Sequence, residues 1–104
     1  MKTIKGNLIL KKDTVIKTDL KVEGNIVCEG GRWNLTVEGN INCGNINCGN
    51  IDCGNINCWN IDCRDINASF IVCETRKKKS PKAKTICRNI ITGRSKYEKK
   101  EVKI

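Results

Sequence analysis

Cysteine is the residue type in this chain with the most obvious capacity for chemistry. Eight cysteines are present, and most of them recur every five residues, with Ala68 filling the one gap in the series. Structural zinc sites use close pairs such as C-x₂-C, whereas the spacing here is C-x₄-C. Buried thiols pack as small hydrophobes, so we expect them to be reduced and metal-free, with no cofactor; redox or metal chemistry is the alternative. The series comprises Cys43, Cys48, Cys53, Cys58, Cys63 and Cys73.

No catalytic constellation accompanies these thiols. The sequence has no histidine, which is the commonest general base and metal ligand. Asp52, Asp62 and Asp65 occupy repeat positions where asparagine serves elsewhere, so they read as surface groups rather than an acid/base pair. The glycines lack the Lys-Ser/Thr of a phosphate-binding loop. We therefore expect the protein not to be an enzyme.

The second chemical feature is a basic C-terminal segment. Residues 76–104 carry twelve Lys/Arg against two acids, a net charge of +10, whereas residues 24–75 carry two against six, a net charge of −4. Such a segment can bind phosphates non-specifically through released counterions, or it can be a solvated tail. Its candidate polyanion-binding residues are Arg76, Lys77, Lys78, Lys79, Lys82, Lys84, Arg88, Arg94 and Lys96.

A third feature is Trp59, which replaces glycine at an outward position of the repeat, one repeat before Arg64. An exposed tryptophan beside an arginine has the composition of a protein interface. Trp59 and Arg64 are therefore candidates for a protein-binding site, although Trp59 could instead pack over a neighbouring segment.

The elements that must position these residues follow from the five-residue period. Isoleucine is invariant in one phase, cysteine or alanine fills a second, and Asn or Asp generally lies between them. Inward Ile, outward Asn/Asp and inward Cys is the alternation of a strand, and the following Gly-Asn tolerates positive φ at a corner. The variable glycine phase is expected to face solvent. The isoleucines are Ile41, Ile46, Ile51, Ile56, Ile61, Ile66 and Ile71.

This pattern resembles the pentapeptide-repeat proteins, and more closely short phage- and prophage-type proteins with runs such as Gly-Asn-Ile-Asp-Ala. The resemblance implies an all-β, right-handed parallel β-helix with four pentads per coil and about five coils. Cys43 would then stack near Cys63, Cys28 near Cys48, and Cys53 near Cys73. The order large Ile, then Asn/Asp, then small Cys differs from the usual pentapeptide order and leaves three sides as an alternative.

One domain is expected to span all 104 residues. It divides into N-terminal cap strands over residues 1–23, a pentad core over 24–75 and the basic segment over 76–104. We interpret 76–84 as a solvated loop, and 85–92 and 101–104 as less regular strands. The N-terminus lacks an apolar run typical of a signal or membrane span. These features predict a cytoplasmic protein, in a bacterial host if the phage resemblance holds.

Two functions remain open. The resemblance implies a phage or mobile-element accessory factor that binds a host protein or nucleoprotein complex and blocks a nucleic-acid defence, as an anti-CRISPR does. The basic segment would add contact with nucleic acid, and no membrane partner is expected. The alternative is a structural element of a virion or filament. Such an element would self-assemble, or dimerise, through the ends of the β-helix.

Overall fold

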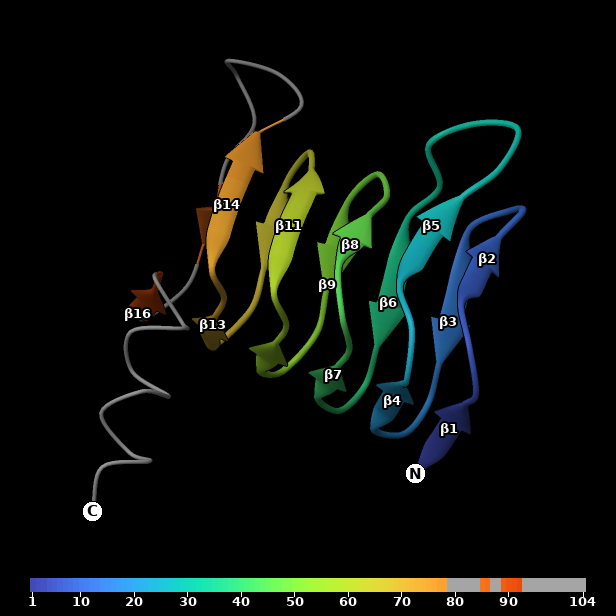
Figure 1. Ribbon diagram of the computed structural model, residues 1–104, viewed down its shortest axis with the longest axis horizontal. Coiled ribbons are helices and arrows are strands. Elements are labelled where there is room, and N and C mark those ends of the chain that lie inside the picture. The colour runs from blue at the N-terminus through green and yellow to red at the C-terminus, as the bar shows by residue number, and fades with distance from the viewer. Residues whose placement is uncertain (79–84, 87–88, 93–104) are drawn as a thin grey trace.

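The computed structural model describes residues 1–78, 85–86 and 89–92, and these form a parallel β-helix whose coils follow one another along a single axis (Figure 1). Sixteen short strands are assigned in this part of the chain. They are β1 (Lys2–Ile4), β2 (Leu8–Leu10), β3 (Thr14–Ile16), β4 (Leu20–Val22), β5 (Ile26–Cys28), β6 (Leu35–Val37), β7 (Ile41–Asn42), β8 (Ile46–Asn47), β9 (Ile51–Asp52), β10 (Ile56–Asn57), β11 (Asn60–Cys63), β12 (Ile66–Asn67), β13 (Phe70–Val72), β14 (Thr75–Lys78), β15 (Thr85–Ile86) and β16 (Asn89–Ile91).

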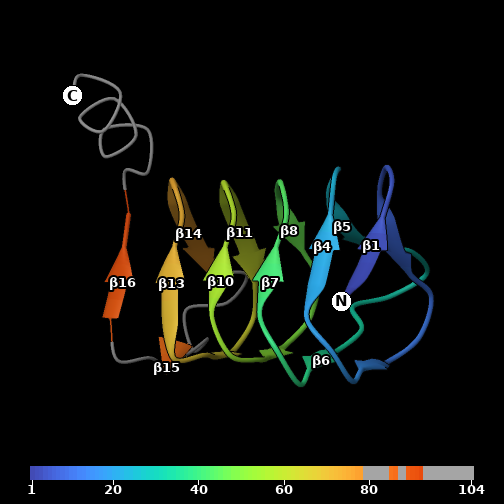
Figure 2. The same cartoon turned by 90° about the horizontal axis from the view of Figure 1, so that it is seen from below.

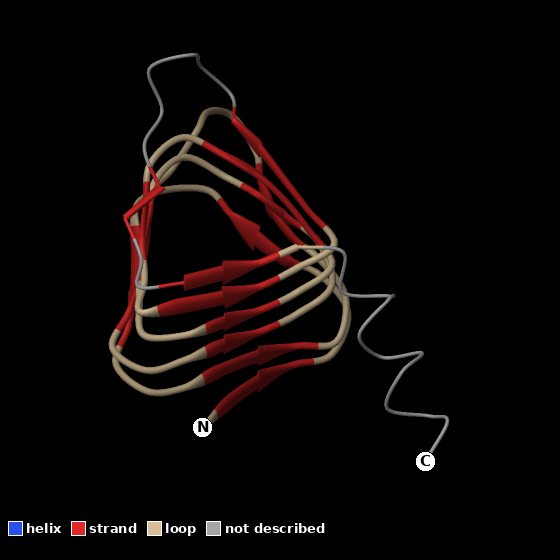
Figure 3. Cartoon of the chain, turned by 90° about the vertical axis from the view of Figure 1, so that its left-hand side faces the viewer, coloured by secondary structure: helices blue, strands red, loops and turns tan. Residues whose placement is uncertain are grey.

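The coil has three sides, so the expectation of a quadrilateral coil is wrong. Every third strand joins the same sheet: sheet A runs β1-β4-β7-β10-β13-β16, sheet B runs β2-β5-β8-β11-β14, and sheet C runs β3-β6-β9-β12-β15. Ile56 therefore pairs with Ile41, fifteen residues earlier, rather than twenty. Seen along the axis, the three sheets enclose a triangular core, and the coils wind in the right-handed sense (Figure 3).

Two repeat lengths build the same triangle. The first coil has sides of six residues, so that Leu20 lies beside Lys2 after eighteen residues. The later coils have sides of five residues, and the coil shortens to fifteen. In both lengths the first and third residues of a side point inward and the last forms the corner. The expected cap strands within residues 1–23 are β1 to β4, and they belong to the same three sheets as the later coils.

The interior is a stack of isoleucine layers. All seven isoleucines of the pentad phase are buried, with at most 2% of each side chain exposed, in agreement with the inward assignment. The earlier coils fill the same columns with Leu20, Ile26 and Leu35. Among the described residues, none that is polar or charged is buried. Stability therefore comes from apolar stacking and from hydrogen bonds between the coils.

The glycines serve a purpose other than the expected one. Of the described residues only Gly6 and Gly30 have positive φ, so the pentad corners do not use left-handed backbone. Gly49 is buried rather than solvent-facing, and a Cβ built on it would lie 2.8 Å from the carbonyl oxygen of Trp33. At Gly54 a Cβ would lie 2.6 Å from Oδ1 of Asn40. Glycine is needed here because successive coils approach closely.

The C-terminal part of the structure agrees only in part with the loop and strands predicted from the sequence. The strands expected within 85–92 occur as β15 and β16, which lie on sheets C and A (Figure 2). Residues 76–78, expected as the start of a loop, instead belong to β14, which pairs with β11. The rest of the expected loop and the expected strand at 101–104 lie outside the described residues.

We predict that Ile51→Ala destabilises the domain by about 2–5 kcal/mol, because it leaves a cavity in a core layer. The adjacent Asp52 points outward and is exposed, so Asp52→Ala should change stability by only about 0.5 kcal/mol or less. Urea unfolding of both variants measures the difference. Equal effects would show that the inward and outward assignments are wrong.

Candidate functional site

The most regular polar feature of the surface is a ladder of side-chain hydrogen bonds at each corner. Between sheets A and B, Oδ1 of Asn7 accepts the backbone N–H of Asn25 at 2.8 Å, and Oδ1 of Asn25 accepts that of Asn45 at 2.9 Å. Oδ1 of Asn45 then accepts the N–H of Asn60 at 3.2 Å. Finally, the hydroxyl of Thr75 donates to Oδ1 of Asn60 at 2.9 Å.

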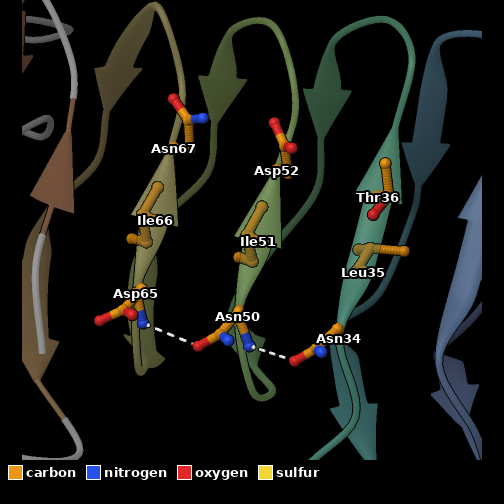
Figure 4. Close-up of a pocket in the computed structure, with 9 residues that line it drawn as sticks. All are labelled: Asn34, Leu35, Thr36, Asn50, Ile51, Asp52, Asp65, Ile66 and Asn67. Atoms are coloured by element: carbon orange, nitrogen blue, oxygen red, sulfur yellow. Dashed lines mark hydrogen bonds between the residues drawn. The ribbon is translucent and has the colours of Figure 1, made fainter.

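The corner between sheets B and C repeats this arrangement. Oδ1 of Asp13 accepts the N–H of Asn34 at 2.9 Å, and Oδ1 of Asn34 accepts that of Asn50 at 3.1 Å. The N–H of Asp65 donates to Oδ1 of Asn50 at 3.1 Å (Figure 4).

Between sheets C and A, Oδ1 of Asp19 accepts the N–H of Asn40 at 2.8 Å, and Oδ1 of Asn40 accepts that of Asn55 at 2.8 Å. Each acceptor satisfies a corner amide that has no strand partner. This requirement explains why the last residue of a side is almost always Asn or Asp.

Each sheet has one row of outward side chains, and the outer surfaces of sheets A and C are called face A and face C. The outward rows give these two faces different characters. Sheet A presents the neutral amides Asn42 and Asn57 and then Val72, one per coil. A shallow hollow on this face is bordered by the exposed Phe70.

Sheet C is more acidic, with Thr36, Asp52 and Asn67 in register. Its own hollow also borders the ladder residues Asn34, Asn50 and Asp65 (Figure 4). Neither hollow is an enclosed cavity, so these faces suit contact with a large partner better than enclosure of a small ligand.

The structure places Trp59 and Arg64 at the two ends of strand β11, and their role as a protein-binding site stays a prediction. Trp59 lies at the corner between sheets A and B, and Arg64 lies at the corner between sheets B and C, with strand β11 separating them. Both are exposed. Trp59 follows β10 of sheet A, whereas Phe70 lies in register with Asn55 at the opposite edge of that sheet, at the corner between sheets C and A.

Arg76, a candidate polyanion-binding residue, lies at the end of the isoleucine column of sheet B. It occupies the isoleucine phase, in register with Ile61. Its guanidinium donates to the carbonyl oxygens of Cys63 at 3.0 Å and Arg64 at 2.6 Å, and to Oγ1 of Thr85 at 2.9 Å. The side chain thus joins the last coils and closes the isoleucine column, which sequence reasoning missed although the five-residue count after Ile71 leads directly to it.

The other candidate polyanion-binding residues are not brought together by any described contact. Lys77 and Lys78 lie on β14, where only their backbone is described. The remaining candidates, Lys79, Lys82, Lys84, Arg88, Arg94 and Lys96, lie outside the described residues.

The cysteines stack fifteen residues apart in the pentad coils. Cys43, Cys58 and Cys73 follow the paired strands β7, β10 and β13 of sheet A. The expected neighbours Cys43–Cys63 and Cys53–Cys73 are therefore wrong, because they assume a coil of twenty residues.

Cys28 does stack near Cys48, as expected, because the coil that separates them has twenty residues. Cys63 follows in the same column of sheet B. In sheet C, Cys53 stacks with Ala68 instead of with another thiol.

Burial favours the protonated form of two of these thiols, Cys53 and Cys73. Burial, followed by the charge of Asp52, raises the pKa of the Cys53 thiol to about 12. Burial also raises the pKa of Cys73. A thiolate is the reactive form of cysteine, so these two thiols are poor nucleophiles near neutral pH.

A loop at residues 29–34 holds the other tryptophan, and sequence reasoning missed this arrangement. Trp33 donates its indole N–H to the carbonyl of Glu29 at 2.9 Å, and its backbone N–H to Sγ of Cys28 at 3.4 Å. The ring covers Gly31, where a Cβ would lie 2.9 Å from the indole. The signal was the nine-residue interval between Ile26 and Leu35, where six is usual for this part of the chain.

The described residues contain no group of three or more His, Cys, Asp or Glu side chains arranged to hold a metal ion. None of them forms a helix long and apolar enough to cross a membrane. No family model, curated protein or solved structure matches the chain.

We predict that Asn40→Ala lowers the free energy of unfolding by about 1 kcal/mol, because the N–H of Asn55 loses its acceptor. Asn40→Asp should recover most of this loss, since Asp13 and Asp19 accept the same bond in the first coil. Asn42→Ala, on the outward row of face A, is the matched control and should change little. Denaturant unfolding that ranks Asn42→Ala equal to Asn40→Ala would contradict the ladder's role.

Proposed function

We propose that this chain is a non-enzymatic binding protein that docks onto a nucleic-acid-handling complex of a bacterial host, as a counter-defence factor of a mobile element would. The observation that carries the proposal is the separation of charge along the sequence. A central region of net charge −4 leads into a segment of net charge +10. The host and the counter-defence role rest on the resemblance to phage-type repeat proteins.

Face A supports the protein-binding half of this proposal. Phe70 is 45% exposed and Trp59 38% exposed, and Val72 lies on the same sheet. Exposed aromatic residues are typical of protein interfaces, and these two lie at opposite edges of sheet A. The surrounding Asn42 and Asn57 carry no charge, so the face can be desolvated at low electrostatic cost.

The position of this face supports the nucleic-acid half. Phe70 and Val72 lie on β13, which pairs with β16 (Asn89–Ile91) on sheet A. The basic residues Arg94 and Lys96 follow β16 closely in the sequence, and β16 belongs to the sheet that carries Phe70. A nucleoprotein could bind face A through its protein and the basic segment through its nucleic acid. Because the two sites belong to one chain, binding at one raises the effective concentration at the other.

An absence of enzymatic activity is part of the proposal. The chain has no histidine, and its carboxylates at Asp13 and Asp19 accept backbone N–H groups in the corner ladders. The shallow hollows over sheets A and C are lined mainly by amides and apolar groups.

The structural alternative, end-to-end assembly, is less favoured. Continued stacking requires an apolar residue in the isoleucine column of the next coil, but Arg76 occupies that place in sheet B. A further coil from a second molecule would have to bury its guanidinium.

We predict that binding to duplex DNA or RNA weakens when Lys77, Lys78 and Lys79 are changed together to glutamine, and that the slope of log affinity against log salt becomes flatter. The matched control changes Lys11, Lys12 and Lys17 to glutamine, the same loss of charge on exposed residues of the first coil. Fluorescence titration at low and moderate salt measures both. Equal weakening by the two triple variants, or no binding at low salt, would contradict a polyanion site in the C-terminal segment.

We also predict one discrete species on a sizing column over a hundredfold range of protein concentration, because the Arg76 end resists stacking. A ladder of oligomers that grows with concentration would favour the structural alternative. Arg76→Leu is the informative variant, since it restores an apolar residue to the column and should promote association.

A further inference from the structure

The thiols on sheets A and B form two straight columns along the axis of the β-helix. Column A is defined as Cys43, Cys58 and Cys73, and column B as Cys28, Cys48 and Cys63. Within each column the flanking residues are paired in parallel register on adjacent strands, as Asn42 is with Asn57. Hydrogen bonds continue this register to the cysteines, since the N–H of Cys43 donates to the carbonyl of Asn57 at 3.0 Å.

The register fixes the spacing of the sulfurs. Adjacent strands lie about 4.8 Å apart, and equivalent atoms of side chains in the same rotamer repeat at that distance. Two inward thiols, on sheets A and C, make the same local contact. The thiols of Cys43 and Cys53 each donate to the carbonyl of the following glycine, at 3.7 and 3.9 Å.

A column with this spacing suits one kind of ligand. A metal–thiolate bond is about 2.3 Å long, so a linear S–metal–S unit spans about 4.6 Å, close to the coil spacing. A tetrahedral zinc or iron site needs four ligands around one point, which three sulfurs in a line do not provide. A disulfide needs Cβ atoms about 3.8 Å apart, which would require the coils to be compressed.

The surroundings also select the charge of the ligand. The core contains no buried polar or charged residue among those described, so a metal–dithiolate unit should carry no net charge. A monovalent ion between two thiolates leaves a net charge of −1, whereas a divalent ion leaves zero. Soft metals are the ones that thiolates select.

We propose that each cysteine column is a binding site for one soft, two-coordinate divalent metal ion, with mercury(II) as its representative. Two thiols on adjacent coils bind the ion and release two protons to solvent. The metal stays in the +2 state and no electron is transferred. Cys58 is the middle thiol of column A, and Cys48 is the middle thiol of column B. Each column can form two pairs of adjacent thiols, and the middle thiol belongs to both of them.

Cys53 provides the matched control. It is an inward cysteine of the same repeat phase, but its column neighbour on the next coil is Ala68. It therefore lacks a thiol partner on that coil. Ala68 also shows that alanine is accepted at this phase, so Cys→Ala variants should keep the fold.

The test offers mercury(II) as its bis-glutathione complex, in excess glutathione, while the full-length protein refolds from denaturant. All variants carry Cys87→Ala, because Cys87 lies outside the described residues. Two column thiols replace the two glutathione ligands of the mercury ion, and the two glutathiones leave as free thiols. The protein thiols are favoured because a stacked pair has a high effective concentration. Native mass spectrometry counts the metal ions, and the mercury–thiolate absorption band reports their coordination.

We expect two ions per chain in the parent and in Cys53→Ala, one in Cys58→Ala or Cys48→Ala, and none in the double variant Cys48→Ala/Cys58→Ala. Thermal melting checks that each variant is folded. If Cys58→Ala does not fold, the pair Cys43→Ala/Cys73→Ala tests the same column by leaving Cys58 without a stacked thiol. Retention of two ions by the double variant, equal loss in Cys53→Ala and Cys58→Ala, or no retention by the parent would overturn the proposal.

Discussion

In-register stacking of identical side chains is the constraint on which the rest of the structure depends. The strands have only two to four residues, too few to fix register alone. The corner ladders supply what is missing, because the Oδ1 atom of Asn25 or Asn40 accepts an amide of the next coil and so places each corner over the last. Once the corners are aligned, isoleucine lies over isoleucine in every sheet.

The same constraint gives the molecule its surfaces and its end. Inward columns must be apolar, which leaves one outward residue per side to differ between the faces. Face A acquired Phe70 and Val72, and face C acquired Asp52. Arg76 takes the place of one inward isoleucine, and its guanidinium donates to two carbonyls of the preceding corner and to the Thr85 hydroxyl. Stacking therefore explains the display of side chains, and among the described residues Arg76 ends the isoleucine column of sheet B.

The inward residues could be predicted from the sequence, whereas the shape of the coil could not. An invariant isoleucine beside a Cys/Ala position has one physical explanation, burial in a repeating core. The number of sides is different, because a pentad has the same alternation in a triangle and in a square. The six-residue interval from Leu8 to Thr14 and Leu20 escaped notice, since those coils lack an invariant residue. The role of Gly49 also depends on the coil below it, which the local sequence does not reveal.

The distance in sequence between stacked neighbours tests this account most directly. An isotope-edited NOE spectrum of the full-length protein would report which backbone protons lie side by side. Three sides predict strong contacts between residues fifteen apart in the pentad coils, such as Asn42 with Asn57, and none between Asn42 and Asp62. Contacts between residues twenty apart, without those at fifteen, would contradict the triangular coil and the thiol columns and aromatic face built on it.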